Sequence, residues 1–311
     1  MFHEAIGGDV NIEINNIYNE DCISILSKFN DNSIDLIIAD PPYFRILQEK
    51  WDRFKTFDEY LDWSKKYLSL CVNKLRLSGT FLLYGCSRSF STLCELNRIL
   101  LDRGMYFVEE IVIDKGMKSV AGRVSNKIKM YPAVSENILV YRKDAKPFIK
   151  ELLKQKQKEN NIAVNEIKTY LGMALNGGGN WTKYCGNTEF PLLPTEEHWN
   201  KLCELLKISI QYKEIEEVYN GQFGLTNVWN DINFYIKNRI HPSEKPLILS
   251  ERLVKSFSRE NDLVYVPFAG SGSEIEACIK NNRNYIATEI NSEYCDLIKK
   301  RLNKIHTICS L

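Results

Sequence analysis

The segment Ser33-Ile-Asp-Leu-Ile-Ile-Ala39 runs directly into Asp40-Pro41-Pro42-Tyr43. Its short β-branched run is typical of a strand buried in a parallel sheet. Neither proline can continue a ladder of backbone hydrogen bonds, so the strand must stop before them. We therefore predict a buried parallel strand that presents Asp40 at its carboxyl end.

Strands and helices alternate on both sides of this segment. Before residue 148 we predict helices over 58–75 and 89–102 and strands over 79–84, 106–113 and 137–141. After residue 234 we predict helices over 246–257, 273–281 and 292–305 and strands over 262–266 and 285–289. Such alternation is typical of an α/β fold with a doubly wound, mostly parallel, Rossmann-like sheet.

The middle of the chain interrupts this alternation. A polar, basic helix candidate over 150–161 is followed by the glycine-rich segment Asn176–Asn180 and by an amphipathic helix after Pro194. We predict that residues 148–234 form an inserted, mainly helical subdomain. The α/β domain then consists of two parts, residues 1–147 and 235–311.

The composition is that of an ordinary folded protein. Of the 311 residues, 44% are hydrophobic and 26% are charged, which excludes a disordered chain, a collagen and a coiled-coil rod. The length predicts one large domain or two of moderate size. No apolar run approaches the roughly 20 residues that span a bilayer, and residues 1–9 lack a signal-peptide pattern, so we expect a cytoplasmic protein without a membrane partner.

The nine cysteines are odd in number, scattered and without a CxxC pair. This distribution argues against a disulfide framework and against a zinc site. We therefore expect reduced thiols and no bound metal.

Positive charge is concentrated in one part of the chain. Residues 114–158 contain twelve Lys or Arg and four Asp or Glu, a net charge of +8, so the remainder carries −7 against a total of +1. Such a stretch is either a solvated face or a surface that binds a polyanion.

The segment Leu263-Val-Tyr-Val-Pro-Phe-Ala-Gly-Ser-Gly-Ser273 predicts a strand, a glycine turn and a helix, and Glu289 ends the next strand. Glycines let a cofactor approach the backbone, and an acid about 20 residues further on accepts from ribose hydroxyls. Position 275 is Ile, so the third glycine of a dinucleotide fingerprint is absent. A turn that needs glycine only for its backbone conformation is the alternative. The strand, the helix and Glu289 together favour a nucleoside cofactor.

Asp40-Pro41-Pro42-Tyr43 places acceptors and an aromatic ring where open α/β sheets bind ligands. The prolines remove amide donors and leave carbonyl and carboxylate oxygens. If Asp40 and the Pro41 carbonyl bind the two N–H groups of an exocyclic base amine, the nitrogen can attack an electrophilic methyl group while Tyr43 stacks on the base. A Pro-Pro turn that only ends a strand is the alternative.

Three motifs together, Asp40–Tyr43, His241-Pro-Ser-Glu-Lys-Pro246 and Pro267-Phe-Ala-Gly-Ser-Gly272, resemble those of the amino-methylating (N6/N4) DNA methyltransferases. The tetrapeptide precedes the glycine motif with a long insert between them, as in the beta group of that family. The resemblance covers the chain outside the insert. It implies a Rossmann-like methyltransferase fold, S-adenosylmethionine as the cofactor and DNA as a partner.

The resemblance also implies roles for individual residues. The target base would bind at Asp40, Pro41, Pro42 and Tyr43. The residues implied to bind the cofactor are Asp21, Ser243, Lys245, Pro267, Phe268, Ala269, Gly270, Gly272 and Glu289. Among them, Glu289 would hold the ribose, Asp21 the adenine amine and Lys245 the carboxylate, whereas His241 is expected to be structural.

DNA binding follows from the same resemblance, because a base inside a duplex must be flipped out to react. The residues of the basic stretch that would hold the DNA backbone are Lys115, Lys118, Arg123, Lys127 and Lys129. The inserted subdomain, with Asn180, Trp181, Lys183, Tyr184 and the helix after Pro194, would recognise the target sequence. Trp181, Trp199 and Trp229 are nevertheless expected to pack in the core.

Two positions depart from the family pattern. Val266 stands where the family usually has Asp before the Pro-Phe of the glycine motif, which removes a polar contact at the cofactor pocket. Ser135 precedes Glu136 where many relatives have His. The first departure motivates an alternative hypothesis, a non-catalytic nucleic-acid-binding relative.

The resemblance favours adenine N6 as the methylated atom, because Asp at the first tetrapeptide position goes mostly with adenine and Ser with cytosine. Cytosine N4 is the closest alternative, and methylation of RNA or of a protein glutamine amide is a third. The Pro-Cys dipeptide needed for cytosine-C5 methylation is absent. Beta-group relatives imply a homodimer, and a cognate restriction nuclease is a further candidate partner.

Overall fold

The computed structural model describes residues 12–44, 54–86, 90–117, 129, 131–175, 180–186, 188, 191–234 and 244–309. The chain forms two compact units. The first comprises residues Met1–Lys143 and Val218–Leu311, and the second comprises Asp144–Glu217.

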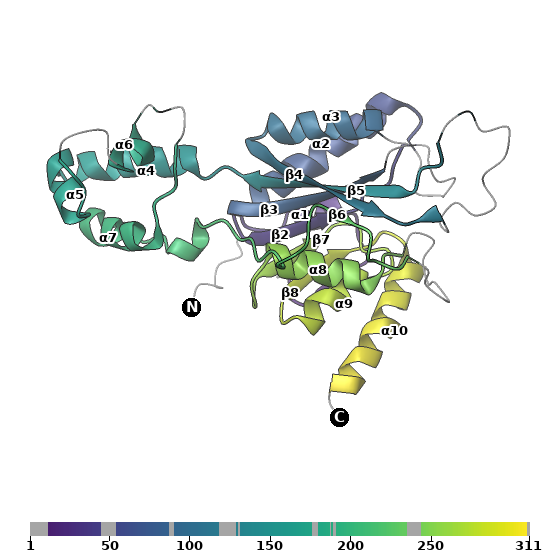
Figure 1. Cartoon of the computed structure of the whole chain (residues 1–311). Helices are drawn as coiled ribbons and strands as arrows, with labels where there is room; N and C mark the ends of the chain where they lie inside the picture. The colour runs from purple at the N-terminus through teal and green to yellow at the C-terminus, as the bar shows by residue number, and fades with distance from the viewer. Residues whose placement is uncertain are drawn as a thin grey trace. The chain divides into compact units, whose positions relative to one another are not determined.

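An eight-stranded sheet forms the centre of the first unit, in the order β1-β8-β7-β2-β3-β5-β4-β6 (Figure 1). Its strands are β1 (Asn16–Tyr18), β2 (Ile34–Ala39), β3 (Leu75–Cys86), β4 (Met105–Asp114), β5 (Ser135–Lys143), β6 (Val228–Trp229), β7 (Leu263–Val266) and β8 (Asn284–Thr288). Neighbours are parallel except where β5 pairs with β3 and with β4. The predicted doubly wound, mostly parallel α/β fold is confirmed.

The strand β2 lies between β7 and β3 and is buried on both faces. Leu36 and Ile38 pack in one apolar cluster, and Ile37 and Ala39 pack in the other. Side chains of a strand alternate between the two faces, so an uninterrupted apolar run is what a central strand requires. The strand ends at Ala39, with one residue between it and the first of the two prolines predicted to stop it.

Helices cover both faces of the sheet (Figure 1). The helices α1 (Cys22–Leu26), α2 (Phe57–Lys74) and α3 (Phe90–Leu101) cover one face, and α8 (Leu247–Phe257), α9 (Ser273–Lys280) and α10 (Ser292–Cys309) cover the other. The helix α2 begins where the Thr56 hydroxyl accepts a hydrogen bond from the backbone N–H of Glu59. Each helix therefore buries its apolar side against one face of the sheet.

The second unit is helical and has a core of its own. It contains α4 (Lys146–Glu159), α5 (Val164–Tyr170), α6 (Asn180–Cys185), α7 (Glu196–Leu206) and the 3-10 helix η3 (Tyr212–Glu214). Trp199 is fully buried and its indole N–H donates to the carbonyl of Ile210 at 2.9 Å. Trp181 is also buried here, and Trp229 is buried in the first unit. The prediction that these tryptophans pack in the core is confirmed.

The limits of this unit differ from the predicted insert, residues 148–234. The second unit begins at Asp144 and ends at Glu217, so residues 218–234 belong to the first unit. The reason is β6, which pairs with β4 at the end of the sheet. Trp229 of β6 packs in the core of the first unit.

No helix in the part of the chain that the structure describes combines the length and the apolar character needed to cross a membrane.

Candidate active site

Three loops follow parallel strands at one edge of the sheet. Asp40 follows β2, Pro267 follows β7 and Glu289 follows β8. These strands are parallel neighbours, and their carboxyl ends therefore lie at the same edge. The chain leaves β2 toward β3 and leaves β7 toward β8, in opposite directions along the sheet. Open α/β sheets bind ligands at such a switch point.

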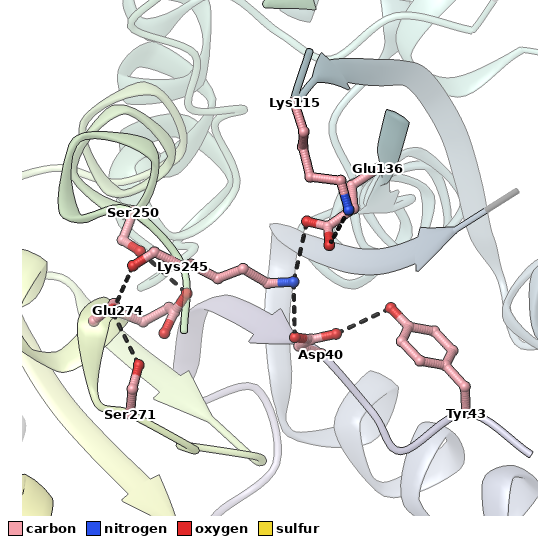
Figure 2. A network of polar contacts seen from close by, with 9 residues as sticks. Asp40, Tyr43, Lys115, Glu136, Lys245, Ser250, Ser271 and Glu274 are labelled. Carbon is pink, nitrogen blue, oxygen red and sulfur yellow. Dashed lines mark hydrogen bonds and ion pairs between the residues drawn. The ribbon is translucent and has the colours of Figure 1, made fainter. Parts of the chain in front are cut away.

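Both carboxylate oxygens of Asp40 have a donor (Figure 2). The Tyr43 hydroxyl donates to Oδ1 at 3.0 Å, and the Lys245 ammonium lies 3.1 Å from Oδ2. Pro41 and Pro42, directly after Asp40, have no amide N–H to donate. The predicted tetrapeptide therefore brings a carboxylate, two prolines and a phenol together at the sheet edge.

Lys245 lies immediately before α8 and reaches back toward the sheet edge. Its side chain is only 9% exposed, and its ammonium contacts Oδ2 of Asp40 and Oε2 of Glu136, each at 3.1 Å. The Tyr84 ring lies beneath it, 4.6 Å from the ring centre to Nζ. The sequence resemblance implied that this lysine receives the cofactor's carboxylate. In the structure its ammonium contacts two protein carboxylates.

Glu136 connects Lys245 to a second lysine, because its Oε1 accepts from Lys115 at 3.1 Å. Glu136 is the second residue of the antiparallel strand β5, opposite Cys86 of β3 and Ile113 of β4, so it lies at the edge where those strands end. Burial alone would raise the pKa of Glu136, but the charges of Lys245 and Lys115 outweigh it and lower that pKa. Likewise, burial alone would lower the pKa of Lys245, but Asp40 and Glu136 raise it. Glu136 and Lys245 are therefore both charged at neutral pH.

A second buried carboxylate, Glu274, lies in the first turn of α9. Ser250 of α8 donates to its Oε1 at 3.1 Å (Figure 2). Burial raises the pKa of Glu274, and the neighbouring charge of Asp40 acts in the same direction. The Ser273 hydroxyl beside it donates to the carbonyl of Lys245 at 2.9 Å, which joins the glycine turn to the Lys245 backbone.

The glycine turn has the backbone that the motif predicts. Gly270 has φ 51° and Gly272 has φ 77°, both in the left-handed region that favours glycine. A Cβ on Gly272 would lie 2.8 Å from Cγ2 of Ile298, so the turn also has no room for a side chain there. The turn thus keeps its backbone bare next to the carboxyl ends of β7 and β8.

Glu289 faces this turn. Its Oε2 accepts from the N–H of Gly270 at 2.9 Å, and its Oε1 accepts from the N–H of Asn291 at 2.8 Å. A carboxylate has about four lone-pair sites, so it retains capacity for a further donor. Burial raises the pKa of Glu289.

An aromatic group completes this side of the edge. Phe268 of the glycine turn lies with its ring centre 5.8 Å from Trp63 and 5.4 Å from Tyr67, both of α2. A partly buried ring, a bare glycine turn and a carboxylate with spare acceptor capacity together fit the adenosine part of a nucleoside cofactor. In this arrangement Phe268 would contact the base, Glu289 would accept from the ribose hydroxyls, and the backbone of Pro267, Ala269, Gly270 and Gly272 would line the site.

Asp21 has a local role in the structure. It is the N-cap of α1, and its Oδ1 accepts from the N–H of Ile23 at 2.8 Å. It follows β1, whose neighbour β8 ends next to Glu289, and the Tyr18 carbonyl accepts from the N–H of Glu289. Asp21 is therefore on the correct edge of the sheet, while one of its oxygens is engaged in capping.

The predicted DNA-contacting residues are only partly described. Lys118, Arg123 and Lys127, like the predicted cofactor residue Ser243, lie outside the described residues. Lys129 is exposed. Lys115 is partly buried and paired with Glu136, so it faces the active site.

Three residues at this edge were not assigned from the sequence: Tyr84, Glu136 and Glu274. One signal for Glu136 was available, since a charged residue directly before a buried strand marks a strand end. Neither Tyr84 nor Glu274 had such a signal, because each looks like an ordinary residue of a strand or a helix.

Comparison with known proteins agrees with this geometry. A family model described as DNA methylase, of N6/N4 type, matches residues 34–300. Type II methyltransferase M.HinfI of Haemophilus influenzae is 24% identical over 96% of this chain and 70% of its own length. The DNA adenine methyltransferase YhdJ of Escherichia coli strain K12 is 26% identical over 94% of this chain and 83% of its own length.

The fold is also that of solved structures. The complex of M1.HpyAVI with its ligand SAM superposes with a TM-score of 0.54 at 18% identity, over 92% of this chain and 98% of that chain. At this identity the likeness establishes the fold, with its Rossmann-like sheet.

Proposed function

The chain belongs to the N6/N4 family of DNA methylases, and from this premise we propose that it transfers the methyl group of S-adenosylmethionine to the N6 amine of adenine in DNA. The observation that carries the proposal is the Asp40 carboxylate, held between Tyr43 and Lys245 at the switch point of the sheet. DNA is the substrate of this family and S-adenosylmethionine its methyl donor. The finer steps concern which base reacts and which residues act.

Asp40 and Pro41 would make the amine nucleophilic. The lone pair of an exocyclic amine is delocalised into the base, so the nitrogen is planar and reacts poorly. Hydrogen bonds from its two N–H groups to the Asp40 carboxylate and the Pro41 carbonyl would favour tetrahedral nitrogen and localise that lone pair. When bound, the cofactor would supply an electrophilic methyl group and leave as the neutral thioether S-adenosylhomocysteine. The proton lost from the nitrogen would pass to the Asp40 carboxylate and on to solvent. No covalent bond between protein and base is needed.

The cofactor would bind across the glycine turn. We assign Glu289 to its ribose hydroxyls and Phe268 to its base, with the backbone of Pro267 to Gly272 close to the sugar and the methionyl group. Asp21 remains a candidate for the adenine amine and Ser243 for the cofactor's carboxylate. Lys245, whose ammonium is engaged by Asp40 and Glu136, is better explained by a different role, described in the next subsection.

Adenine is favoured over cytosine by two observations. The tetrapeptide begins with Asp rather than Ser, and YhdJ, a relative over most of the chain, is named an adenine methyltransferase. Cytosine N4 would use the same acceptors and the same displacement, so the base must be identified by experiment.

The hypothesis of a non-catalytic relative rested on Val266, and the surroundings of that residue weaken it. Val266 is 1% exposed and packs in the apolar cluster with α8 and α9. Valine in place of the family's usual Asp therefore extends the apolar core. Glu289, Phe268 and the glycine turn retain the features that a cofactor needs.

The second unit is our candidate for target recognition. Lys146, Lys150, Lys154 and Lys158 recur every fourth residue of α4, which aligns them along one side of the helix. Such a row suits the phosphates of a nucleic acid. A homodimer and a cognate restriction nuclease remain proposals, the second supported by the type II relatives.

The direct test uses purified protein, tritiated S-adenosylmethionine and duplex DNA, followed by digestion to nucleosides. We expect label in N6-methyladenine with the native protein and none with Asp40→Ala. Asp62→Ala, an exposed acid of α2, is the matched control and should methylate normally. Label in N4-methylcytosine would correct the base, and label only in RNA or protein would overturn the proposal.

A further inference from the structure

Lys245 is a buried cation that contacts the reacting carboxylate itself. Its Nζ lies 3.1 Å from Oδ2 of Asp40, and its side chain is 9% exposed, against 24% for Asp40. The two residues come from loops 205 positions apart in the sequence, one after β2 and one before α8. A charged pair buried this far from solvent is held by direct contact with little screening.

The ammonium is fixed from several sides. Glu136 of β5 contacts it at 3.1 Å (Figure 2). The centre of the Tyr84 ring of β3 lies 4.6 Å from it. The carbonyl of Lys245 also accepts from Ser273 at the start of α9, which fixes the backbone of the lysine. Both the side chain and the backbone of Lys245 are therefore held by contacts within the protein. These contacts fix the position of Nζ without a bound ligand.

We propose that Lys245, held by Glu136, is a positioning residue for methyl transfer: it contacts Oδ2 of Asp40, orients the carboxylate, and thereby directs Oδ1 toward the target amine. The inference rests on the proposed function, because it assumes that Asp40 accepts from the amine. Lys245 itself touches neither the base nor the methyl group.

This arrangement also gives Tyr43 a defined role before the base binds. Its hydroxyl donates to Oδ1, the oxygen that Lys245 leaves open. An amine N–H and the phenol would compete for that oxygen. If the entering base displaces the phenol from this hydrogen bond, the Tyr43 ring is free to stack on the base. The Tyr43 hydroxyl thus fills the amine position in the protein without DNA.

Other charged or titratable groups surround Asp40 and Lys245. Together they determine in which direction the loss of Lys245 changes the ionisation of Asp40. Among the described residues they are Tyr43, Tyr84, Lys115, Glu136 and Glu274. Glu136 and Glu274 are carboxyls whose charges would raise the pKa of a neighbouring acid, and Lys115 is shared with Glu136. Lys245 is the cation in direct contact with Asp40, so its loss should make Asp40 harder to ionise.

The test is a Lys245→Met variant, with Lys245→Arg as the conservative rescue. In single turnovers at saturating cofactor and DNA, we expect Lys245→Met to react about 100-fold more slowly, the usual scale for misplacing a reacting group. The acidic limb of its rate against pH should move to higher pH, because an unpaired Asp40 is protonated more easily. Lys245→Arg should return the limb toward its native position.

A matched control removes a different cation from between two carboxylates. Arg301 of α10 lies 2.9 Å from Glu244 and 2.5 Å from Glu276, and it also donates to the carbonyl of Ser271 at 3.1 Å. Within the part of the chain that the structure describes, these contacts do not include Asp40. Arg301→Met should therefore leave the acidic limb where it is, whatever it does to thermal stability. A merely structural role for Lys245 would likewise change stability and leave the limb in place.

Calorimetric measurement of S-adenosylmethionine binding distinguishes the positioning role from the alternative, in which Lys245 binds the cofactor. If Lys245 binds the cofactor's carboxylate, Lys245→Met will weaken cofactor binding, and the acidic limb will not move; that result would overturn the inference. If Lys245→Met does not fold, the same measurements on Glu136→Gln and Lys245→Arg decide, since Glu136→Gln loosens Lys245 and should slow the reaction without weakening cofactor binding. If the native protein does not methylate adenine, the proposed function is refuted. That result is distinct from an acidic limb that does not move in Lys245→Met, which refutes only the positioning role of Lys245.

Discussion

Gly272 shows how little freedom a single residue of the cofactor turn has. Its φ of 77° disfavours a side chain, and a Cβ at this position would lie only 2.8 Å from Ile298. Gly104 has a similar φ of 82° but open space around it. We expect Gly104→Ala to lower the free energy of unfolding by about 1 kcal/mol and Gly272→Ala by about 3 kcal/mol, because only the second adds overpacking to backbone strain.

Urea unfolding measures both values, and calorimetry measures cofactor binding in each variant. Gly272→Ala should also lose affinity for S-adenosylmethionine, while Gly104→Ala should bind it normally. Equal effects of the two substitutions on stability would contradict the close contact with Ile298.

Glu274 predicts a pH dependence of stability. Burial raises its pKa in the folded protein, so the folded state binds the proton more tightly than the unfolded state. The stability linked to this group is therefore complete below its ordinary pKa and is lost as pH rises through the folded pKa. In Glu274→Gln that loss is absent, and the amide oxygen can still accept from Ser250.

We expect Glu274→Gln to be more stable than the native protein by on the order of 1 kcal/mol at about pH 8, and by less at about pH 5. Unfolding in urea at both pH values gives the difference. If the difference in the free energy of unfolding between the two proteins does not grow with pH, ionisation of Glu274 does not destabilise the folded state.

At the scale of elements, one carboxylate ties three neighbouring strands together. Asp35 of β2 accepts from Arg76 of β3 at 2.7 Å and from the N–H of Leu263 of β7 at 2.8 Å. The Arg76 side chain is 8% exposed, so breaking this pair leaves a charge with little access to water.

Asp35→Asn should therefore lower the free energy of unfolding by on the order of 2 kcal/mol, less than a fully buried pair because Asp35 is itself partly exposed. The control is Asp62→Asn, which breaks the exposed pair with Lys65 on α2 and should have little effect. Similar losses in the two variants, measured by chemical unfolding, would show that Asp35 does not join the strands energetically.

At the scale of the whole molecule, the two units are joined at neighbouring points of the sheet unit. Arg142 donates to the carbonyl of Val218 at 3.4 Å, so the chain leaves and re-enters the first unit at adjacent positions. A short glycine-serine linker could then replace Asp144–Glu217. We expect the shortened protein to fold and to bind S-adenosylmethionine, but to lose most of its affinity for DNA.

Thermal unfolding, calorimetry and a DNA-binding titration test these three expectations. Methylation of the same DNA sequences at the native rate by the shortened protein would exclude a recognition role for the second unit.

The fold could be predicted because its signals are local. The apolar run of β2, the prolines after it and the glycine turn each report on a few consecutive residues, and the alternation of helices and strands follows from them. The two-residue β6 has no such periodicity, and for that reason the predicted insert extended to residue 234 instead of Glu217.

The active site could be predicted only in part for the same reason. Asp40, Gly272 and Glu289 belong to short sequence motifs, so their positions in the site could be predicted from a few consecutive residues. The contact of Lys245 with Asp40 and Glu136 joins three distant segments, and it depends on the antiparallel register that brings Glu136 to the edge of the sheet. Register is a property of strand pairing, and no short motif encodes it.

Whether Asp40 carries methyl transfer to adenine can be measured by nucleoside mass spectrometry of genomic DNA from a methylation-deficient host that expresses this protein or its Asp40→Ala variant. We expect N6-methyladenine with the native protein and none with the variant. N6-methyladenine that persists without the Asp40 carboxylate, or a folded native protein that leaves the host DNA unmethylated, would contradict this expectation.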